Sequence, residues 1–468
     1  MPKPKLEPKP KSKFKFTKKA KSQQVNQHVK SIPSTPPPTP MAIHNTSNGE
    51  DYEDQNYATF KTSPMASVAG IAEAKSGANT NQRITRMQIG LIQKILTIVL
   101  LAFGCSAIIR FTLLFDLDKD VVKHKPGPCR IMRNFSQFDG LENGYMEYVE
   151  ELRTLFITEE AQNNFGGIYA FHPPHDQPQS ENKQTHWPDK PSAVRLKIEN
   201  SETSSFDQTK FSPLGISVSV HGSRAILYVV NTFGNEFGGR AIEVFKYLPK
   251  KEALLHLKTI LDDNFQSIRD VQVVAGGGDR FFVVNGFYYQ NKLLRGLEII
   301  TQSRSGNLVF YDGKRSKIVD RSLALPSAIT LDKEREYIYV SNYMTETIKS
   351  YHLSKDNSLS HLAEIGLLSS PKQIYVEKKT GDLWVAAQPV FHKSIKHAIW
   401  NNQTRVPSHV LRIRFQDTRT SWVTTEPFAN DGTSFSGITG ITLIGEHLVI
   451  GSSTGKHYVC EIINYKIA

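Results

Sequence analysis

Three β-type runs follow one another between residues 216 and 247: ISVSV (Ile216–Val220), AILYVVN (Ala225–Asn231) and IEVFKY (Ile242–Tyr247). Short runs rich in Val, Ile, Tyr and Phe, bounded by Gly, Asn, Asp or Ser, are typical of β-strands. A charged turn joins the first two runs, and the second run ends in Val-Val-Asn. The segment therefore predicts a repeating unit of at least three strands.

The same unit recurs at intervals of roughly 45–65 residues, a spacing typical of propeller blades with three or four strands each. The further copies are Val271–Ala275, Arg280–Asn285 and Gly296–Thr301; Ser327–Leu331, Tyr337–Asn342 and Ile348–Leu353; Lys372–Val376, Asp382–Ala386 and His409–Arg414; Ile438–Ile444, His447–Gly451 and His457–Ile462; and a partial copy, Leu152–Thr158 with Gly166–Phe171. A β-sandwich would explain the number of strands but not their recurrence. The sequence predicts an all-β, six-bladed β-propeller over residues 129–468.

The chain has three cysteines, Cys105, Cys129 and Cys460. Cys105 falls within an apolar run, where it could be palmitoylated or packed among apolar neighbours. Cys129 and Cys460 bracket the predicted propeller, whose ring must be closed by joining its first and last strands. We therefore expect a disulfide between them on the oxidising side of a membrane, worth about 4–5 kcal/mol in the chain-entropy model. Two unrelated thiols are the alternative if the intervening segment is cytosolic.

An apolar segment at residues 89–115 precedes the propeller. Ile95–Ile109 has no charged residue, and the whole segment is about 27 residues long, enough to cross a hydrocarbon core of about 30 Å with some tilt. Lys94 and Arg110 lie toward its ends, where long side chains can reach the headgroups. A cleaved signal peptide would begin the chain and have a shorter apolar region. We expect a single uncleaved transmembrane signal-anchor helix.

The charges that flank this segment predict its orientation. Basic residues lie near its N-terminal end and acidic residues follow its C-terminal end: Arg83, Arg86 and Lys94; Asp116, Asp118 and Asp120. Because cytoplasmic flanks are enriched in Lys and Arg, we expect a single-pass type II membrane protein with a lumenal or extracellular propeller. The sequons at Asn134 and Asn402 would then be open to glycosylation. Residence in the endoplasmic reticulum, at the plasma membrane or in both stays open.

Residues 1–88 form a basic, Pro-rich tail. They hold 14 Lys and Arg against 6 Asp and Glu, and the whole chain has a net charge of +12, so most of the excess positive charge precedes the propeller. The tail has too few apolar residues to offset chain entropy, and we expect it to be disordered and cytoplasmic. Its place before an apolar span favours anionic lipid over nucleic acid as a partner. A solvated tail without a ligand is the alternative. Residues 116–128 should form a linker.

Five stretches resemble the paraoxonases, a family of arylesterase and lactonase enzymes, in one consistent order between Cys129 and Ile462. They are Asp207–Val218 with its core FSPLGIS, Leu227–Asn231, the helix-like Leu254–Ile260 (LLHLKTI), Thr380–Val385 (TGDLWV) and Tyr458–Ile462 (YVCEI). This resemblance implies a six-bladed propeller with two calcium ions in its central tunnel and a disulfide that joins its ends.

The resemblance also implies where a catalytic calcium would bind. Such an ion polarises an ester carbonyl as a Lewis acid and takes six to eight hard oxygen ligands. The family's ligand positions correspond to Met146, Arg269, Ser327, Lys372 and Gln373, and its catalytic histidine positions correspond to Leu214 and Thr232. A thioether, a guanidinium and an ammonium cannot ligate calcium. We therefore expect no catalytic residues and no catalytic calcium, and the fixed charges of Arg269 and Lys372 could replace the divalent cation in the tunnel.

The positions of the family's second, structural calcium are better preserved. They correspond to Glu147, the backbone carbonyl of Ile216, and Asp270. Two carboxylates and a carbonyl leave one structural calcium ion open. The alternative is that Asp270 pairs with Arg269 or with a backbone amide.

These features most resemble the membrane-anchored nematode paraoxonase-like proteins, which assist degenerin/epithelial sodium channel subunits. The resemblance implies a catalytically inactive accessory or chaperone protein for membrane-protein clients. A calcium-dependent arylesterase or lactonase is the alternative, and an adhesive ectodomain is a third hypothesis.

Overall fold

The computed structural model describes residues 71–117, 119–132, 144–160, 166–174, 191–202, 204, 206–233, 239–274, 278–400, 404–416 and 419–463, except the side chains of 71–89, 114 and 398–400. The tail up to residue 70 and both predicted glycosylation sites, Asn134 and Asn402, lie outside this description. The expectations for them stay predictions.

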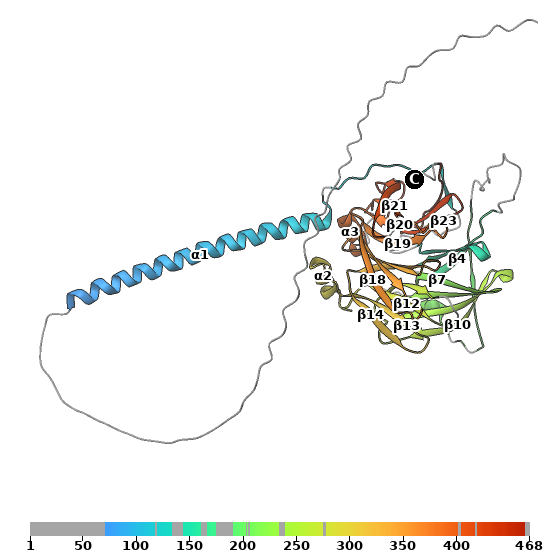
Figure 1. The fold of residues 1–468 in the computed structure, drawn as a ribbon, viewed down its shortest axis with the longest axis horizontal. Helices are drawn as coiled ribbons and strands as arrows, with labels where there is room; N and C mark the ends of the chain where they lie inside the picture. Colours follow the sequence, from blue (N-terminus) through green and yellow to red (C-terminus); the bar gives the residue numbers. More distant parts are fainter. Residues whose placement is uncertain are drawn as a thin grey trace, which may run out of the picture. The chain divides into compact units, whose positions relative to one another are not determined.

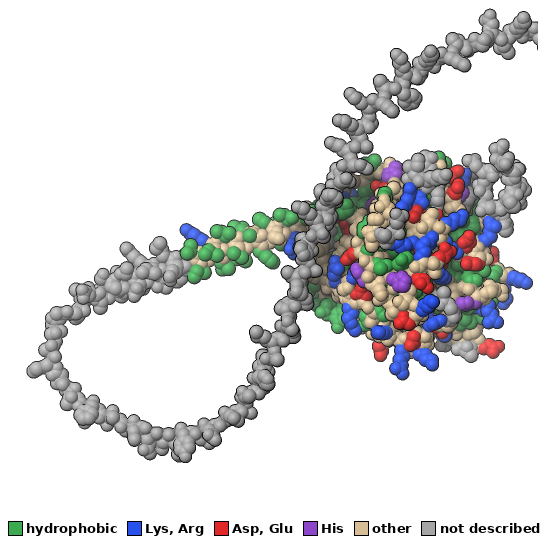
Figure 2. Space-filling model, viewed as in Figure 1, with side chains coloured by type: hydrophobic (Ala, Val, Ile, Leu, Met, Phe, Trp, Pro, Cys, Tyr) green, Lys and Arg blue, Asp and Glu red, His purple; other side chains and the backbone are tan. Residues whose placement is uncertain are grey.

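The helix α1 (Ile71–Phe115) precedes the strands. Its stretch Gly90–Leu113 has 24 residues and is long and apolar enough to cross a membrane. At about 1.5 Å per residue this stretch measures about 36 Å. Apolar side chains cover it, whereas the visible face of the propeller mixes basic and acidic side chains (Figure 2). The helix begins before the predicted boundary at residue 89, because the preceding segment is rich in Ala, Glu, Lys, Gln and Arg, which favour helix.

Six sheets form the described part of the propeller, which confirms the predicted fold class (Figure 1). The sheets, in chain order of their first strands, contain β2 (Met146–Val149), β3 (Thr154–Glu159), β4 (Gly167–Phe171) and β5 (Val194–Arg195); β7 (Pro213–His221), β8 (Arg224–Asn231), β9 (Ala241–Leu248), β10 (Ala253–Leu261) and β6 (Lys197–Asn200); β11 (Ile268–Val273), β12 (Phe281–Asn285), β13 (Gly306–Tyr311) and β14 (Ser316–Leu323); β15 (Pro326–Asp332), β16 (Tyr337–Asn342), β17 (Thr347–Leu353) and β18 (Leu359–Gly366); β19 (Ser370–Val376), β20 (Leu383–Gln388), β21 (Ser408–Phe415) and β22 (Trp422–Asn430); β23 (Ile438–Ile444), β24 (His447–Ser452), β25 (His457–Glu461) and β1 (Cys129–Met132).

The first strand of each blade lines the propeller axis. These inner strands are β2, β7, β11, β15, β19 and β23, and each contacts the next around a ring that closes from β23 back to β2. Because every blade begins with its inner strand, all six run in the same direction. The packed side chains of neighbouring blades form the hydrophobic core between them, as with Leu227, Val229 and Phe281.

Two helices mark one end of the tunnel. α2 (Lys292–Ile300) follows β12, whose last residue pairs with the first residue of β11. α3 (Phe391–Trp400) follows β20, whose Gln388 pairs with Ser370 at the start of β19. We call this the helix end, and we call the opposite end, where the inner strands finish, the open end. At the helix end Phe115 of α1 contacts Phe391, with ring centroids 5.7 Å apart.

The first and last strands close the ring. β1 pairs with β25 in an antiparallel register that sets Cys129 opposite Cys460. The two residues form a disulfide across a sequence separation of 331 residues. The predicted pairing is confirmed, and the linker residue His124 also bridges to Ala429 of β22.

Two local expectations are wrong. Gly296–Thr301 is not a strand, since residues 292–300 form α2 and the third strand of that blade is β13. Asn291 begins the helix, because its side chain accepts a hydrogen bond from the Leu293 N–H at 2.8 Å. The segment Leu254–Ile260, described above as helix-like, lies in β10 and pairs with β9. Its Leu254 and His256 are buried on one side, the period of a strand and not of a helix.

Candidate functional site

The inner strands share an irregularity near the helix end. The ladder between the first and second strands shifts register between Pro213 and Ile216, Ile268 and Asp270, Pro326 and Ile329, Pro371 and Gln373, and Ile438 and Gly440. Such β-bulges turn side chains out of the regular alternation and are common beside active sites. Most of the predicted site residues fall within these shifts, so the bulges decide which of them face the tunnel.

Three buried side chains connect strands across the tunnel near the helix end, and we call them the axial bridge: Tyr145, Ser327 and Gln373. The Tyr145 hydroxyl donates to the Ser327 carbonyl at 3.0 Å, from the start of β2 to β15 on the opposite side of the ring. The Ser327 hydroxyl donates to the Pro371 carbonyl of β19 at 2.5 Å. Tyr145 and Ser327 are 1% and 2% exposed.

Gln373 completes the axial bridge with both ends of its amide. Its Nε2 donates to the Met146 carbonyl of β2 at 2.8 Å, and its Oε1 accepts from the Ile441 N–H of β23 at 2.8 Å. The amide thus joins three inner strands. Its oxygen already accepts a hydrogen bond and points at a backbone donor, so it is not directed toward a cation.

The other three predicted calcium-ligand positions do not supply ligands either. Met146 packs in the hydrophobic cluster between the first and last blades, in contact distance of Gly440 and Gly451. Lys372 is half-buried, with its Nζ 4.8 Å from the centre of the Tyr343 ring.

Arg269 is 7% exposed, and its aliphatic part lies against Gly286. Burial lowers the pKa of Arg295 in α2 to about 10, and the positive charges of Arg269 and Arg240 act in the same direction. Burial is the main cause, and the Glu298 carboxylate opposes the shift. Whether Arg269 and Lys372 act in place of a cation stays a prediction.

The positions of the family's histidines hold no base. Leu214 is buried in the hydrophobic cluster between the first blades, and its carbonyl accepts from the Thr158 hydroxyl at 2.7 Å. The Thr232 hydroxyl donates to the Ser212 carbonyl at 3.2 Å. Glu160 is in reach of the Thr232 and Ser212 hydroxyls, at 3.3 and 3.1 Å. This cluster offers a carboxylate but no nucleophile–base pair.

Two carboxyl groups, those of Asp270 and Glu147, lie farther toward the open end. Together with the Ile216 carbonyl, we call them the carboxylate layer. Asp270 is 4% exposed; its Oδ2 accepts from the Ile329 N–H at 3.0 Å and its Oδ1 from the Val271 N–H at 2.9 Å. Burial raises the pKa of Asp270 well above its ordinary value, and the Glu147 carboxylate adds to the effect. Gly215 is required here, because a Cβ at this position would lie 2.8 Å from the Arg269 carbonyl and would collide with Asp270.

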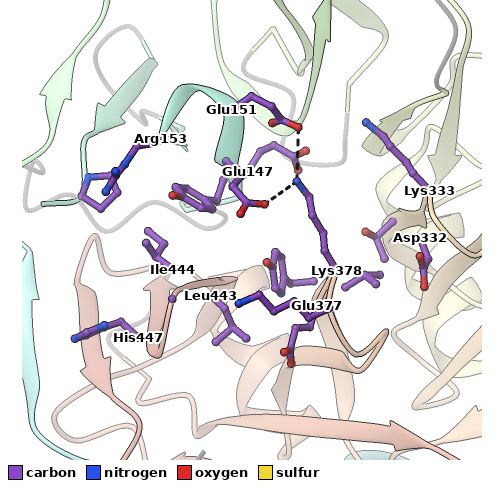
Figure 3. A pocket seen from close by; sticks show the side chains of 18 of the residues that line it. Glu147, Glu151, Arg153, Asp332, Lys333, Glu377, Lys378, Leu443, Ile444 and His447 are labelled. Atoms are coloured by element: carbon purple, nitrogen blue, oxygen red, sulfur yellow. Dashed lines mark hydrogen bonds and ion pairs between the residues drawn. The ribbon is translucent and has the colours of Figure 1, made fainter. Parts of the chain in front are cut away.

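Glu147 connects the carboxylate layer to solvent. Burial raises the pKa of its carboxyl group to about 7, although Lys333, Lys378 and a hydrogen bond from the Val218 backbone oppose the rise. Its side chain is half-buried because it lines a cavity of about 960 Å³ at the open end. Lys378 points across this cavity toward Glu147 and forms ion pairs with Glu150 at 3.1 Å and Glu151 at 3.7 Å (Figure 3).

Comparisons with known proteins agree with this arrangement. The model of the arylesterase family matches residues 160–462. The chain belongs to the arylesterase family. It is 33% identical to mechanosensory abnormality protein 6 of Caenorhabditis elegans over 366 residues, which cover 76% of this chain and 92% of that protein. It is 27% identical to the human serum paraoxonase/arylesterase 2 over 64% of this chain and 80% of that protein.

The two calcium sites of the arylesterase family can be tested against these side chains. The catalytic site does not fit, because the axial bridge uses its oxygen atoms in hydrogen bonds and the remaining positions supply a thioether and two cations. The structural site fits in part: Glu147, Asp270 and the Ile216 carbonyl offer hard oxygens, and burial raises the pKa of both carboxyl groups. Among the described residues, no three His, Cys, Asp or Glu side chains form a metal-binding group. A calcium ion there would rely on carbonyl and water oxygens as well.

Sequence reasoning missed Tyr145. The register of β2 and the closed ring place this residue opposite Ser327, and no local motif indicates that contact. The sequence did carry a signal for the register shifts of the inner strands. Pro213, Pro326 and Pro371 lie at or near the starts of these strands, and Pro in a strand marks a bulge or an end.

Proposed function

We propose that this member of the arylesterase family is a non-enzymatic, membrane-anchored accessory or chaperone protein for membrane-protein subunits, with degenerin/epithelial sodium channel subunits as its client class. The axial bridge is the observation that supports the loss of activity: hydrogen bonds between strands occupy the level at which the family's catalytic calcium would bind. Without that cation, the described residues near Leu214 and Thr232 offer the Glu160 carboxylate but no Lewis acid to polarise an ester.

The client class is supported by relatives. The matched nematode protein is named for a mechanosensory abnormality and shares 33% of aligned residues with this chain. A propeller has broad faces suited to protein contacts, and the charged rim of the open end offers one such face. Fold alone does not identify a partner, so the client class rests on the relationship.

Membrane placement is part of the proposal. Gly90–Leu113 would span the bilayer, the N-terminal tail would be cytoplasmic, and the propeller would lie in the endoplasmic reticulum lumen or outside the cell. The Cys129–Cys460 disulfide supports an oxidising compartment for the propeller. Asn134→Gln and Asn402→Gln should each remove one glycosidase-sensitive step in electrophoretic mobility if the topology is type II.

The first experiment measures hydrolysis of phenyl acetate and a medium-chain lactone by the full chain purified in detergent, with and without calcium. We expect no turnover above the uncatalysed rate, and the human arylesterase relative serves as the positive control. Calcium-dependent turnover would reject the non-enzymatic assignment.

The second experiment co-expresses the full chain with degenerin/epithelial sodium channel subunits and measures subunit abundance, surface delivery and current. We expect all three to rise. The human relative, which shares the fold, is the matched control. An equal rise with that control, or no rise at all, would remove the client assignment.

A calcium-dependent arylesterase or lactonase is the second candidate, and family membership over residues 160–462 favours it. It requires the helix end to open so that Ser327 and Gln373 release their backbone partners. The hydrolysis assay separates the two candidates.

A further inference from the structure

One hydrogen bond of the axial bridge, from Tyr145 to Ser327, crosses the tunnel between opposite sides of the ring, and the others join inner strands that lie closer together. Around the ring β2 is followed by β7, β11 and β15, so Tyr145 and Ser327 come from strands on opposite sides. Gln373 reaches from β19 past its neighbour β23 to β2. Each member is buried, at 1%, 2% and 7% exposure for Tyr145, Ser327 and Gln373.

Every polar atom of the bridge that faces the axis has a protein partner. The Ser327 hydroxyl bonds to the Pro371 carbonyl and also lies 2.8 Å from the Ser341 hydroxyl. The Gln373 amide uses its oxygen and its nitrogen. A divalent cation at this level would have to break these contacts and displace the Tyr145 ring, with no carboxylate among the three residues to repay the loss.

We propose that the axial bridge is a protein-only substitute for the family's catalytic cation. It holds β2, β15, β19 and β23 together as a central cation would, and it closes the tunnel between the helix end and the open-end cavity. The cavity is therefore a blind pocket that can be entered only from the open end. This inference rests on contacts within the tunnel and stands whether or not the proposed clients are correct.

The distribution of charge agrees with a bridge in place of a metal. The axial bridge itself is neutral, and the cationic Lys372 precedes Gln373 directly, so its charge would repel a divalent cation at this level. The carboxylate layer lies beyond the bridge, toward the open end, where Glu147 lines the cavity. The tunnel thus has two levels: the axial bridge, which excludes a metal ion, and the carboxylate layer, which could still accept a cation.

The test measures the thermal unfolding midpoint of the full chain in detergent, in chelator and in calcium, with all variants in an Asp270→Asn background so that the carboxylate layer does not respond. Gln373→Leu removes both amide bonds and should lower the midpoint by roughly 5 °C. Gln272→Leu is the matched control, because Gln272 is also a buried glutamine of an inner strand but bonds only to the adjacent strand and its own strand. Its midpoint should fall less.

Gln373→Glu is the decisive variant. It adds a hard oxygen ligand but loses the donor to the Met146 carbonyl, so the midpoint should fall and calcium should not restore it while Tyr145 fills the axis. Adding Tyr145→Ser should make that variant responsive to calcium. If Gln373→Leu does not fold, Tyr145→Phe removes one hydroxyl only and should lower the midpoint by a few degrees.

Two results would overturn the inference. One is a calcium-dependent rise in the midpoint of the Asp270→Asn chain with the bridge intact, since a cation would then bind beside the bridge. The other is a Gln373→Leu midpoint no lower than that of Gln272→Leu, since the amide would then not be holding the strands together.

Discussion

The two levels of the tunnel satisfy buried polar groups in opposite ways. At the helix end, the axial bridge pairs neutral side chains with backbone groups of other inner strands, and Lys372 lies beside it in the sequence. Toward the open end, Asp270 and Glu147 are acidic groups whose pKa is raised by burial, to about 7 for Glu147. The axial bridge has its hydrogen bonds satisfied without a ligand. In the carboxylate layer the two carboxylates repel each other, and a proton or a cation can relieve this repulsion. In a family that is calcium-dependent, the proposed axial bridge would replace one ligand site by hydrogen bonds, whereas the carboxylate layer keeps two buried carboxyl groups.

The largest expected effect concerns the support of the carboxylate layer. Gly215→Ala would place a Cβ within 2.5 Å of the Asp270 Cα, and two backbones would have to separate. We expect a loss of roughly 3–4 kcal/mol in the free energy of unfolding, or failure to fold. Chemical denaturation measures it. Gly366→Ala is the control, since no atom lies within 4 Å of its added Cβ; equal losses for both variants would show that close approach at Gly215 is unimportant.

The second prediction concerns pH. A carboxyl group with a pKa raised in the folded state holds its proton more tightly there than in the unfolded chain. Stability should therefore fall as the pH rises from about 4.5 to about 7, the ordinary and folded-state values of Glu147, and level off above. Because the cavity admits solvent, we expect a change of roughly 2 kcal/mol.

Glu147→Gln should reduce this slope and leave the parts that belong to Asp270 and to Glu346, whose pKa burial also raises, to about 7 for Glu346. Denaturation curves across the pH range measure it for both proteins. An unchanged slope in the variant would contradict a raised pKa at Glu147.

The third prediction adds calcium. A cation held by the carboxylate layer would neutralise both carboxylates, so about 1 mM calcium at neutral or higher pH should stabilise the full chain by about 1–2 kcal/mol for a dissociation constant near about 0.1 mM. Thermal unfolding with calcium or magnesium measures it. Asp270→Asn should abolish the calcium response. No response in the unmodified chain would mean that protons alone occupy this level.

The smallest expected effect comes from the cavity rim. Lys378→Met removes exposed ion pairs with Glu150 and Glu151, which should change stability by less than about 1 kcal/mol. It also removes a positive charge that lowers the pKa of Glu147, so that pKa should rise further. Titration of Glu147 by nuclear magnetic resonance measures the shift, and Lys355→Met, at an exposed turn, is the control.

Much of the fold could be predicted from the sequence because the strand pattern repeats. Ile438–Ile444 and Tyr337–Asn342 match β23 and β16 residue for residue. A prediction failed where a segment that connects two strands forms a helix of its own. Gly296–Thr301 is apolar enough for a strand, but the Asn291 cap and a helical period make it part of α2. Blade recurrence gives no information about what is inserted between two strands.

The candidate site, too, could be predicted from the sequence only in part. The identities of Met146, Arg269 and Lys372 already exclude calcium ligation by these side chains, since a thioether, a guanidinium and an ammonium are not ligands for calcium. That Ser327 and Gln373 are held in hydrogen bonds could not be predicted, because their partners lie on other blades.

By itself, then, the sequence determined the all-β repeat, the apolar span and the pairing of Cys129 with Cys460. These follow from local composition, periodicity and the need to close a ring. Only the tertiary structure decided that Tyr145 spans the tunnel, that Gly215 supports Asp270, and that Glu147 is enclosed enough for its pKa to rise. Such properties depend on distances between strands far apart in the chain and on the exclusion of water, which no single stretch of sequence specifies.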